Sequence, residues 1–300
     1  MTSRAPEQLL VSICNVAGFP RPSCLLLLNI HVGDAEWVDV GTGDALLVSG
    51  TGICSDDEHI YHLSIVQAGF GTMLTVLDRS SLEVVYVQSL PEVSDAHSLL
   101  INDKELFVTS TGTDEIIAFE IRAHEVVRPR LVWSATGSGL DTHHINSLTL
   151  AGDELLCSAF GSKNGDSWAT AKAGYIYSIT RSRRVIEGLQ QPHTLLWQRG
   201  QLYFCNSQRG TVNTAEGVVA RLDGYSRGLA FGEDGTMYAS SSIGRHSSQA
   251  DGASALFGNP SDPGTLAGRC AVVQIPPGGP FSQEIDISPY GFEIYDLLTP

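Results

Sequence analysis

The sequence predicts an all-β protein: a single β-propeller of about six four-stranded blades, with the last blade closed by both termini. Three observations predict this fold. One hairpin pattern recurs along the chain, glycine is abundant while charge is low, and no stretch carries a sustained helical period. The 31 glycines supply the backbone angles that tight turns need, and the charged fraction is only 17%.

The recurring unit is a small residue followed by an aliphatic anchor, a short polar turn and then an apolar strand. The aliphatic anchor and the first apolar residue after the turn are seven positions apart in four copies, as in Leu99 and Leu106. In the fifth copy, Leu229 and Met237 are one position further apart. Turn residues between alternating apolar residues predict a β-hairpin, and one or two further strands follow each hairpin. Four strands per unit are typical of a propeller blade, whereas a β-sandwich is the competing fold. The five copies begin at Gly52, His97, Asn146, His193 and Arg227.

The two chain ends supply the remaining strands. Residues 292–298 form one apolar segment, and the N-terminal region offers three, at 9–15, 24–30 and 35–40. Together they predict a sixth blade that both termini close, which removes the open sheet edges. We therefore expect one domain over residues 1–300, with long loop inserts at 162–173 and 245–269. The second insert has no strand or helix pattern, and a loop of that length is usually functional or disordered.

Composition narrows the classes of partner. A net charge of -15 argues against nucleic acid, which requires clustered basic residues. We expect no membrane segment, because the apolar run near residue 25 is far too short to cross a bilayer, and no signal peptide is evident. A cytoplasmic protein is the resulting expectation. The six cysteines lack metal-binding spacing, so buried free thiols are predicted ahead of disulfides or zinc.

A ring of polar residues is predicted around the central channel. The innermost strands of a propeller line this channel, so the residue before each small–aliphatic pair lies at one height in every blade. Glu293 is the expected counterpart in the sixth blade, with Phe292 as the alternative. By the period-two rule, the residues two positions earlier face the same way. The ring positions are Thr51, His97, Asn146, His193 and Arg227, and the earlier positions are Asp95, His144, Gln191 and Tyr225.

These residue types suit metal binding or acid–base chemistry. His97, His144 and His193 are the candidate ligands for a divalent metal (Zn, Fe, Mn, Ni or Cu), or they act as general acids and bases. A wet channel whose polar residues bond one another is the plain alternative. Arg227 suits a substrate carboxylate or phosphate, although a structural ion pair with Asp95 or Glu293 is equally open.

Four motifs resemble an uncharacterised bacterial family of propeller-like proteins, some of them encoded in biosynthetic clusters. The resemblance spans roughly residues 90 to 245 and implies the fold and the channel site, but no reaction. Ser147 and Thr149 depart from the family pattern, where glycine and alanine are expected. More distantly, the architecture resembles gluconolactonase-like and strictosidine-synthase-like propellers and streptogramin lyase. The motifs are DAHSLL around His97, HHINSLTL around Asn146, QPHTLLW around His193 and YSRGLAF around Arg227.

The leading hypothesis is an enzyme that acts on a small anionic metabolite or biosynthetic intermediate at the channel mouth. Lyase, cyclase or isomerase chemistry is favoured, because the sequence holds no GxSxG nucleophile motif and no nucleotide-binding glycine loop. The alternative, from another class, is a non-catalytic propeller that binds a ligand or a partner protein. The expected catalytic residues are His97, His144, Asn146, His193 and Glu293; the expected substrate-binding residues are Thr51, Tyr225 and Arg227. Trp168 is expected in the core or at the rim, and the two inserts, which hold Trp168 and Phe257, are alternatively expected to cap the channel mouth.

Overall fold

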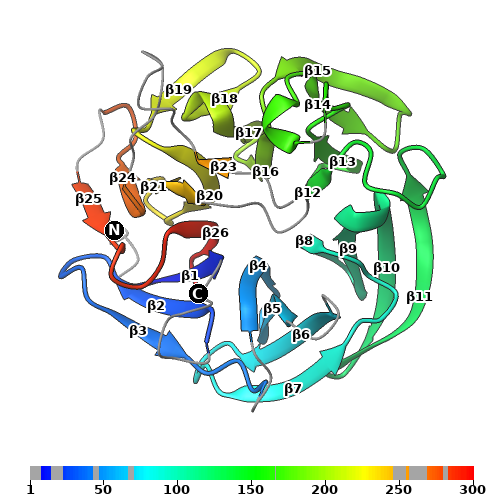
Figure 1. Ribbon diagram of the computed structural model, residues 1–300. Coiled ribbons are helices and arrows are strands. Elements are labelled where there is room, and N and C mark those ends of the chain that lie inside the picture. The colour runs from blue at the N-terminus through cyan, green and yellow to red at the C-terminus, as the bar shows by residue number, and fades with distance from the viewer. Residues whose placement is uncertain are drawn as a thin grey trace.

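The computed structural model describes residues 8–14, 23–42, 47–66, 71–165, 167–245, 255–256, 269–279 and 283–300. Six antiparallel sheets of four strands each form a ring around a central channel, so the chain is a six-bladed β-propeller and the predicted fold class is confirmed (Figure 1). Hydrogen bonds between neighbouring strands satisfy the backbone within each blade.

Each blade is numbered by its position along the chain, with its innermost strand first. Blade one comprises β4 (Leu47–Ser55), β5 (His59–Val66), β6 (Gly71–Asp78) and β7 (Val84–Ser89). Blade two comprises β8 (Ala96–Asn102), β9 (Glu105–Ser110), β10 (Glu115–Arg122) and β11 (Glu125–Ser134). Blade three comprises β12 (Ile145–Ala151), β13 (Glu154–Ala159), β14 (Gly174–Ser178) and β15 (Arg183–Leu189). Blade four comprises β16 (Pro192–Gln198), β17 (Gln201–Asn206), β18 (Thr211–Thr214) and β19 (Gly217–Arg221).

Blade five comprises β20 (Tyr225–Phe231), β21 (Met237–Ser242), β24 (Ala271–Ile275) and β25 (Gln283–Asp286). Blade six combines β26 (Glu293–Leu298) with β1 (Gln8–Cys14), β2 (Leu25–Asn29) and β3 (Ala35–Val38), so the C-terminal strand is innermost and the N-terminal strands lie outside it. The termini therefore share one blade, as the sequence predicts. The register pairs Leu10 with Leu298 and Val11 with Leu297.

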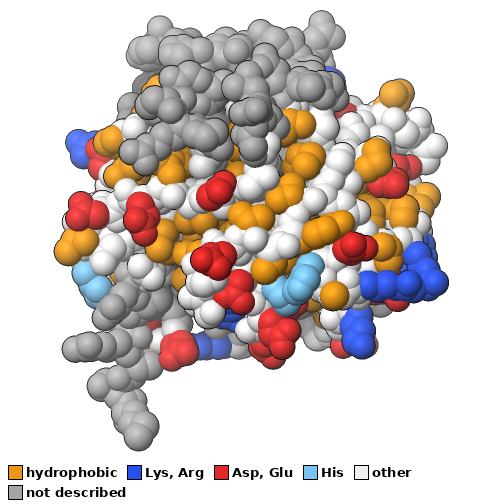
Figure 2. Space-filling model, turned by 90° about the horizontal axis from the view of Figure 1, so that it is seen from below, with side chains coloured by type: hydrophobic (Ala, Val, Ile, Leu, Met, Phe, Trp, Pro, Cys, Tyr) orange, Lys and Arg blue, Asp and Glu red, His pale blue; other side chains and the backbone are white. Residues whose placement is uncertain are grey.

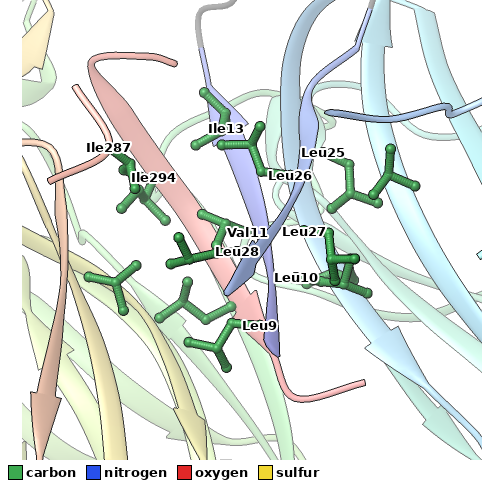
Figure 3. Close-up of a cluster of buried hydrophobic side chains, with 14 of the residues drawn as sticks. Leu9, Leu10, Val11, Ile13, Leu25, Leu26, Leu27, Leu28, Ile287 and Ile294 are labelled. Carbon is green, nitrogen blue, oxygen red and sulfur yellow. The ribbon is translucent and has the colours of Figure 1, made fainter. Parts of the chain in front are cut away.

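Blade six is apolar on both faces because it packs between two neighbouring blades. Along β1, alternate residues point to opposite sides, so Val11 and Ile13 lie on the side of Ile294 while Leu10 lies with Leu27 (Figure 3). The same buried cluster includes Ile53 and Ile60 of blade one together with Tyr238 and Val272 of blade five. The closing blade is thus joined to both neighbours by hydrophobic packing as well as by its own hydrogen bonds.

The two inserts differ in how much of them the structure describes. The first contains a 3-10 turn, η3 (Trp168–Thr170), and Trp168 is buried. Further 3-10 turns are η2 (Thr111–Thr113) and η4 (Ser207–Arg209). At the second insert, β22 (Gly244–Arg245) pairs with β23 (Ala255–Leu256), which corrects the expectation that this loop has no regular structure. Residues 246–254 and 257–268, including the candidate cap Phe257, lie outside the described residues.

The charge of the surface and the burial of the cysteines follow the expectations from composition. Acidic side chains are spread over the side of the ring in Figure 2, whereas basic side chains gather mainly near one edge of that view. None of the six cysteines forms a disulfide, and only Cys54 is not buried, which confirms the prediction of buried thiols. None of the helical segments in the described part of the chain is long and apolar enough to cross a membrane.

Candidate functional site

Every inner strand carries a β-bulge at the predicted ring position. An extra residue on one strand bends it locally and re-aims a side chain, and here the irregularity falls at the ring residue or at the small residue after it. In blade two, for example, Ala96 pairs with Ser110 and Leu99 with Val108, so two residues oppose one. The register shifts lie between Gly50 and Ile53, Ala96 and Leu99, Ile145 and Ser147, His193 and Leu195, Ser226 and Leu229, and Ile294 and Asp296.

The bulge in blade six corrects the predicted alignment of the last copy. The extra residue is Tyr295, so Tyr295, Asp296 and Leu297 correspond to His97, Ser98 and Leu99. Tyr295 is therefore the sixth member of the ring. Glu293 lies two positions earlier, and Phe292 is 52% exposed and precedes the strand.

Of the four residues predicted two positions before the ring, Tyr225 lies in its strand, β20, whereas the other three do not follow the period-two rule. Asp95, His144 and Gln191 precede their strands, and their φ angles are 50°, 54° and 53°. In this left-handed conformation the alternation of a strand does not apply. The Asp95 side chain is 40% exposed as a result. His144 and Gln191 nevertheless turn toward the ring, because their loops bring them there rather than strand geometry.

A pocket of about 300 Å³ occupies the channel between the ring and the ends of the inner strands. His97, Asn146, His193 and Tyr295 of the ring line this pocket, together with Asp296. Aliphatic anchors from all six inner strands form much of the remaining wall. The pocket therefore combines a polar end at the ring with an apolar wall, as small-molecule sites commonly do.

The two ring histidines are held through the same ring nitrogen. The Nδ1 of His97 lies 2.8 Å from the backbone oxygen of Asp95, and the Nδ1 of His193 lies 3.1 Å from that of Gln191. Because a carbonyl oxygen only accepts, these contacts assign the hydrogen of each imidazole to Nδ1. Each Nε2 is then left with a lone pair. For His193, Nε2 is buried without a hydrogen-bond partner among the described residues.

Burial keeps both imidazoles neutral near pH 7. It lowers the pKa of His97 to about 4, against a partial opposing effect of Asp95. It also lowers the pKa of His193 well below its usual value, and the nearby charge of Arg227 adds to the effect. A neutral imidazole with a free Nε2 is able to accept a proton or to bind a metal.

His144 lies beside His97 but is separated from His193 by an aromatic ring. The ring centroids of His97 and His144 are 5.0 Å apart, whereas Phe160 packs 4.5 Å from His144 and 5.0 Å from His193. Trp168 covers His144 at 4.7 Å, so the first insert packs on the site. No three His, Cys, Asp or Glu side chains in the described ranges meet in an arrangement suited to a metal ion. The three histidines are therefore not gathered into one ligand group in the described structure, and metal binding by them stays a prediction.

Arg227 is buried and paired. Its Nη1 lies 3.6 Å from a carboxylate oxygen of Glu293, and its guanidinium carbon lies 5.0 Å from the ring centroids of both Tyr225 and Tyr295. Burial lowers the pKa of Arg227, but Glu293, Cys14, Tyr225 and Tyr295 together outweigh this effect and raise the pKa above its usual value. Of the two structural partners expected from the sequence, Glu293 is the one found, while Asp95 lies beside His97 instead.

The remaining predicted residues are also close to the ring. Asn146 accepts a hydrogen bond from Ser158 at 2.7 Å and donates one to the His144 backbone oxygen, so its amide is fixed. The Tyr225 hydroxyl donates to Gln191 at 2.8 Å. The Thr51 hydroxyl is buried without a hydrogen-bond partner in the described ranges. Of this set, Asn146 alone reaches the pocket lining.

Tyr295 and Asp296 are the pocket residues that the sequence interpretation missed. The signal was present, because Tyr-Asp-Leu repeats the order of ring residue, small residue and aliphatic anchor seen in His-Ser-Leu at 97–99. The match is hard to recognise because aspartate stands at the position after the ring residue, where the other copies have glycine, serine or threonine. Burial raises the pKa of the Tyr295 hydroxyl, so it stays protonated and remains a donor.

Solved structures with the same architecture are numerous but distant in sequence. A protein of unknown function from Bacteroides caccae matches with a TM-score of 0.62 at 10% identity, over 98% of each chain. A putative 6-phosphogluconolactonase from Bacteroides fragilis matches with a TM-score of 0.57 at 14% identity, over 99% of this chain and 98% of that chain. A luciferin-regenerating enzyme matches with a TM-score of 0.56 at 11% identity, over 79% of this chain and 76% of that chain. These likenesses show the propeller fold.

The sequence comparisons point to one family. No curated protein matches the chain. The model of a family described as a domain of unknown function (DUF4915) matches residues 71–297, which includes the inner strands of blades two to five and nearly all of β26. The chain therefore belongs to this family of unknown function.

Proposed function

We propose that the channel pocket is the active site of an enzyme that acts on a small anionic metabolite by acid–base chemistry of the lyase, isomerase or cyclase type. One observation supports this most: the buried His193 Nε2, which has a lone pair and no partner in the described part of the chain. Its imidazole is held in place through Nδ1, which also lies 2.9 Å from the Ser207 hydroxyl. A fixed neutral base beside a pocket is what proton abstraction requires.

The groups around His193 would complete a proton transfer. His193 Nε2 would take a proton from carbon next to a substrate carbonyl, and the electron pair would move to the carbonyl oxygen. The Tyr295 hydroxyl, which has no partner among the described residues, would donate a hydrogen bond to that oxygen. His97 lines the same pocket, so its Nε2 would relay the proton to another atom or return it.

Arg227 would supply the preference for an anion. Its Nε has no hydrogen-bond partner in the described ranges, so the guanidinium retains one free donor beside its pair with Glu293. Arg227 does not line the pocket itself, so the substrate's acidic group would approach from the side where the inner strands begin. The enzymes among the fold neighbours are consistent with a catalytic channel, but at this identity they support the fold alone.

Hydrogen exchange tests this proposal on a panel of candidate substrates. Small 2-oxo acids, hydroxy acids and lactones are incubated with the protein in D₂O, and deuterium at the carbon next to the carbonyl is followed by NMR. We expect exchange on at least one panel member, lost in His193→Gln and retained in the matched surface control His31→Gln. Exchange that is equal in both variants, or absent across the panel, would contradict acid–base catalysis and leave the non-catalytic binding propeller as the better account.

Metal analysis of the same purified protein tests whether a metal takes part in the proposed reaction. Metal content is measured after purification without a histidine tag, and melting is repeated with Zn, Fe, Mn, Ni and Cu. Stoichiometric metal that is lost in the double variant His97→Ala, His193→Ala would restore the metal hypothesis. Exchange activity in metal-free protein would instead support the two histidines as bases.

A further inference from the structure

The carboxyl of Asp296 occupies a position that is occupied by smaller residues in the other five blades. This is the position after the ring residue, where the equivalents are glycine, serine or threonine, namely Gly52, Ser98, Ser147, Thr194 and Gly228.

This position has a structural role that needs no charge. The Ser98 hydroxyl accepts a hydrogen bond from the Leu148 backbone N–H at 3.4 Å, and the Ser147 hydroxyl accepts one from Leu195 at 3.2 Å. Each bond connects one inner strand to the next. Asp296 accepts the equivalent bond from Ile53 at 3.4 Å. A hydroxyl would therefore serve as well at 296, and a buried carboxylate costs more to desolvate.

No cation compensates this carboxyl within the described structure. Its other hydrogen bond comes from its own neighbour Leu297, whose N–H donates at 3.0 Å, and no Lys, Arg or His in the described ranges forms an ion pair with it. Arg227, packed against Tyr295, is offset by Glu293. Burial raises the pKa of Asp296 to about 7, which is the consequence of an apolar site without a counter-ion.

The surroundings of Asp296 offer acceptors and apolar surface. It lines the same pocket as His97 and His193, whose Nε2 atoms are lone-pair acceptors, and the aliphatic anchors form the wall. An ammonium group has three donors and no acceptor, so it matches a carboxylate and two imidazole lone pairs. An alkyl chain attached to that ammonium matches the apolar wall.

We propose that the channel pocket binds a protonated amine carried on a short apolar chain, with Asp296 as its counter-ion. This inference concerns the pocket of the proposed enzyme but does not rest on catalysis. A substrate with both an acidic group and an amine would meet Arg227 on one side of the ring and Asp296 on the other.

A matched pair of probes tests the proposal. Binding of pentan-1-ammonium and of pentan-1-ol to the full chain is measured by NMR titration and by melting temperature at pH 8. We expect the ammonium probe to bind more tightly than the alcohol, and Asp296→Asn to weaken the ammonium probe about tenfold or more while leaving the alcohol unchanged. The surface variant Asp57→Asn, which loses the same charge, is expected to bind both probes like the wild type.

The outcomes separate this proposal from the enzyme proposal. Equal affinity for the two probes, or an ammonium affinity that Asp296→Asn leaves unchanged, would overturn the amine site. If Asp296→Asn does not fold, Asp296→Ser replaces it, because serine supplies the inter-strand hydrogen bond found at Ser98 and Ser147. Absence of hydrogen exchange in the wild type, with tighter binding of the ammonium than of the alcohol, would leave the amine site standing, since binding requires no turnover.

Discussion

At the scale of single residues, the site is built from neutral imidazoles and compensated charges. His97 and His193 are held through Nδ1 and kept neutral by burial, and Arg227 faces Glu293. Residue identity alone predicted that these groups would converge. It did not predict their protonation or pairing, because those depend on which backbone oxygen each imidazole meets and on how deeply each group is buried.

The first prediction concerns the guanidinium of Arg227. Arg227→Lys keeps the charge but loses the planar group that packs against Tyr225 and Tyr295 and reaches Glu293. We expect the free energy of unfolding to fall by about 1–3 kcal/mol, the range for a buried polar group left without its partner. Urea unfolding measures this change. A variant as stable as the wild type, but no longer stabilised by small anions such as malonate, would instead make Arg227 purely an anion clamp.

At the scale of the strand, the β-bulge is the element that makes the site. The repeat was readable because the ring residue, small residue and aliphatic anchor recur in order. The bulge itself was not, since it depends on how each inner strand pairs with its neighbour. For this reason the repeat alone predicts Glu293 rather than Tyr295 in the ring. Strand alternation likewise predicts Asp95, His144 and Gln191 as strand residues, whereas their positive φ angles place them in turns.

The second prediction tests the close contact at the small position. A Cβ at Gly228 would lie 2.8 Å from backbone atoms of Asp296 and Leu297, which cannot move away as a flexible side chain can. Gly228→Ala should therefore cost about 1–3 kcal/mol by overpacking. Ser98→Ala should cost less, about 0.5–1.5 kcal/mol, because it loses one hydrogen bond and adds no atoms. If chemical denaturation finds Gly228→Ala the milder of the two, the inner strands are not in the contact described.

At the scale of the whole molecule, closure by both termini joins the two ends of the chain in one blade. The alternation of apolar segments predicted this blade, and the register between β1 and β26 confirms it. Sequence reasoning succeeded here because closure follows from the number of strands left over at the two ends. It was less successful for the 245–269 insert, whose short strands lack a hydrophobic pattern.

The third prediction follows from this closure. Deletion of residues 292–300 removes β26, exposes the edge of β1 and removes Ile294 and Leu297 from the core. We expect aggregation or loss of cooperative melting, because an open apolar edge is a template for pairing between chains. Light scattering and calorimetry report both. A truncated chain that melts like the full chain would exclude β26 as the closing strand.

The fourth prediction concerns the dependence of stability on pH. Burial lowers the pKa of His62 to about 3 and that of His97 to about 4, and it also lowers the pKa of His193. Below about pH 6.5 these histidines bind protons in the unfolded chain but not in the folded protein, so acidification reduces the free energy of unfolding. The raised pKa of Asp296 acts in the opposite direction, because the folded state retains a proton that the unfolded chain releases above about pH 4. Between pH 4.5 and 6.5 the wild type should therefore lose stability on acidification.

Comparison of the wild type with Asp296→Asn isolates the effect of the Asp296 carboxyl on the pH dependence of stability. Asp296→Asn lacks the opposing group, so its free energy of unfolding should fall more steeply on acidification, by up to about 1.4 kcal/mol per pH unit. Urea unfolding across this range measures both slopes. Parallel slopes would mean that the pKa of Asp296 is not raised in the folded protein.

The most direct test of the account is the protonation state of the ring histidines. The proposed site requires two neutral imidazoles, those of His97 and His193, with the hydrogen on Nδ1 and a lone pair on Nε2. Nitrogen NMR of ¹⁵N-histidine-labelled protein distinguishes these forms, and His97→Gln and His193→Gln assign the signals. Neutral rings with protonated Nδ1 at pH 7 are the predicted result. A doubly protonated ring, or a hydrogen on Nε2 in either residue, would contradict the proposed site.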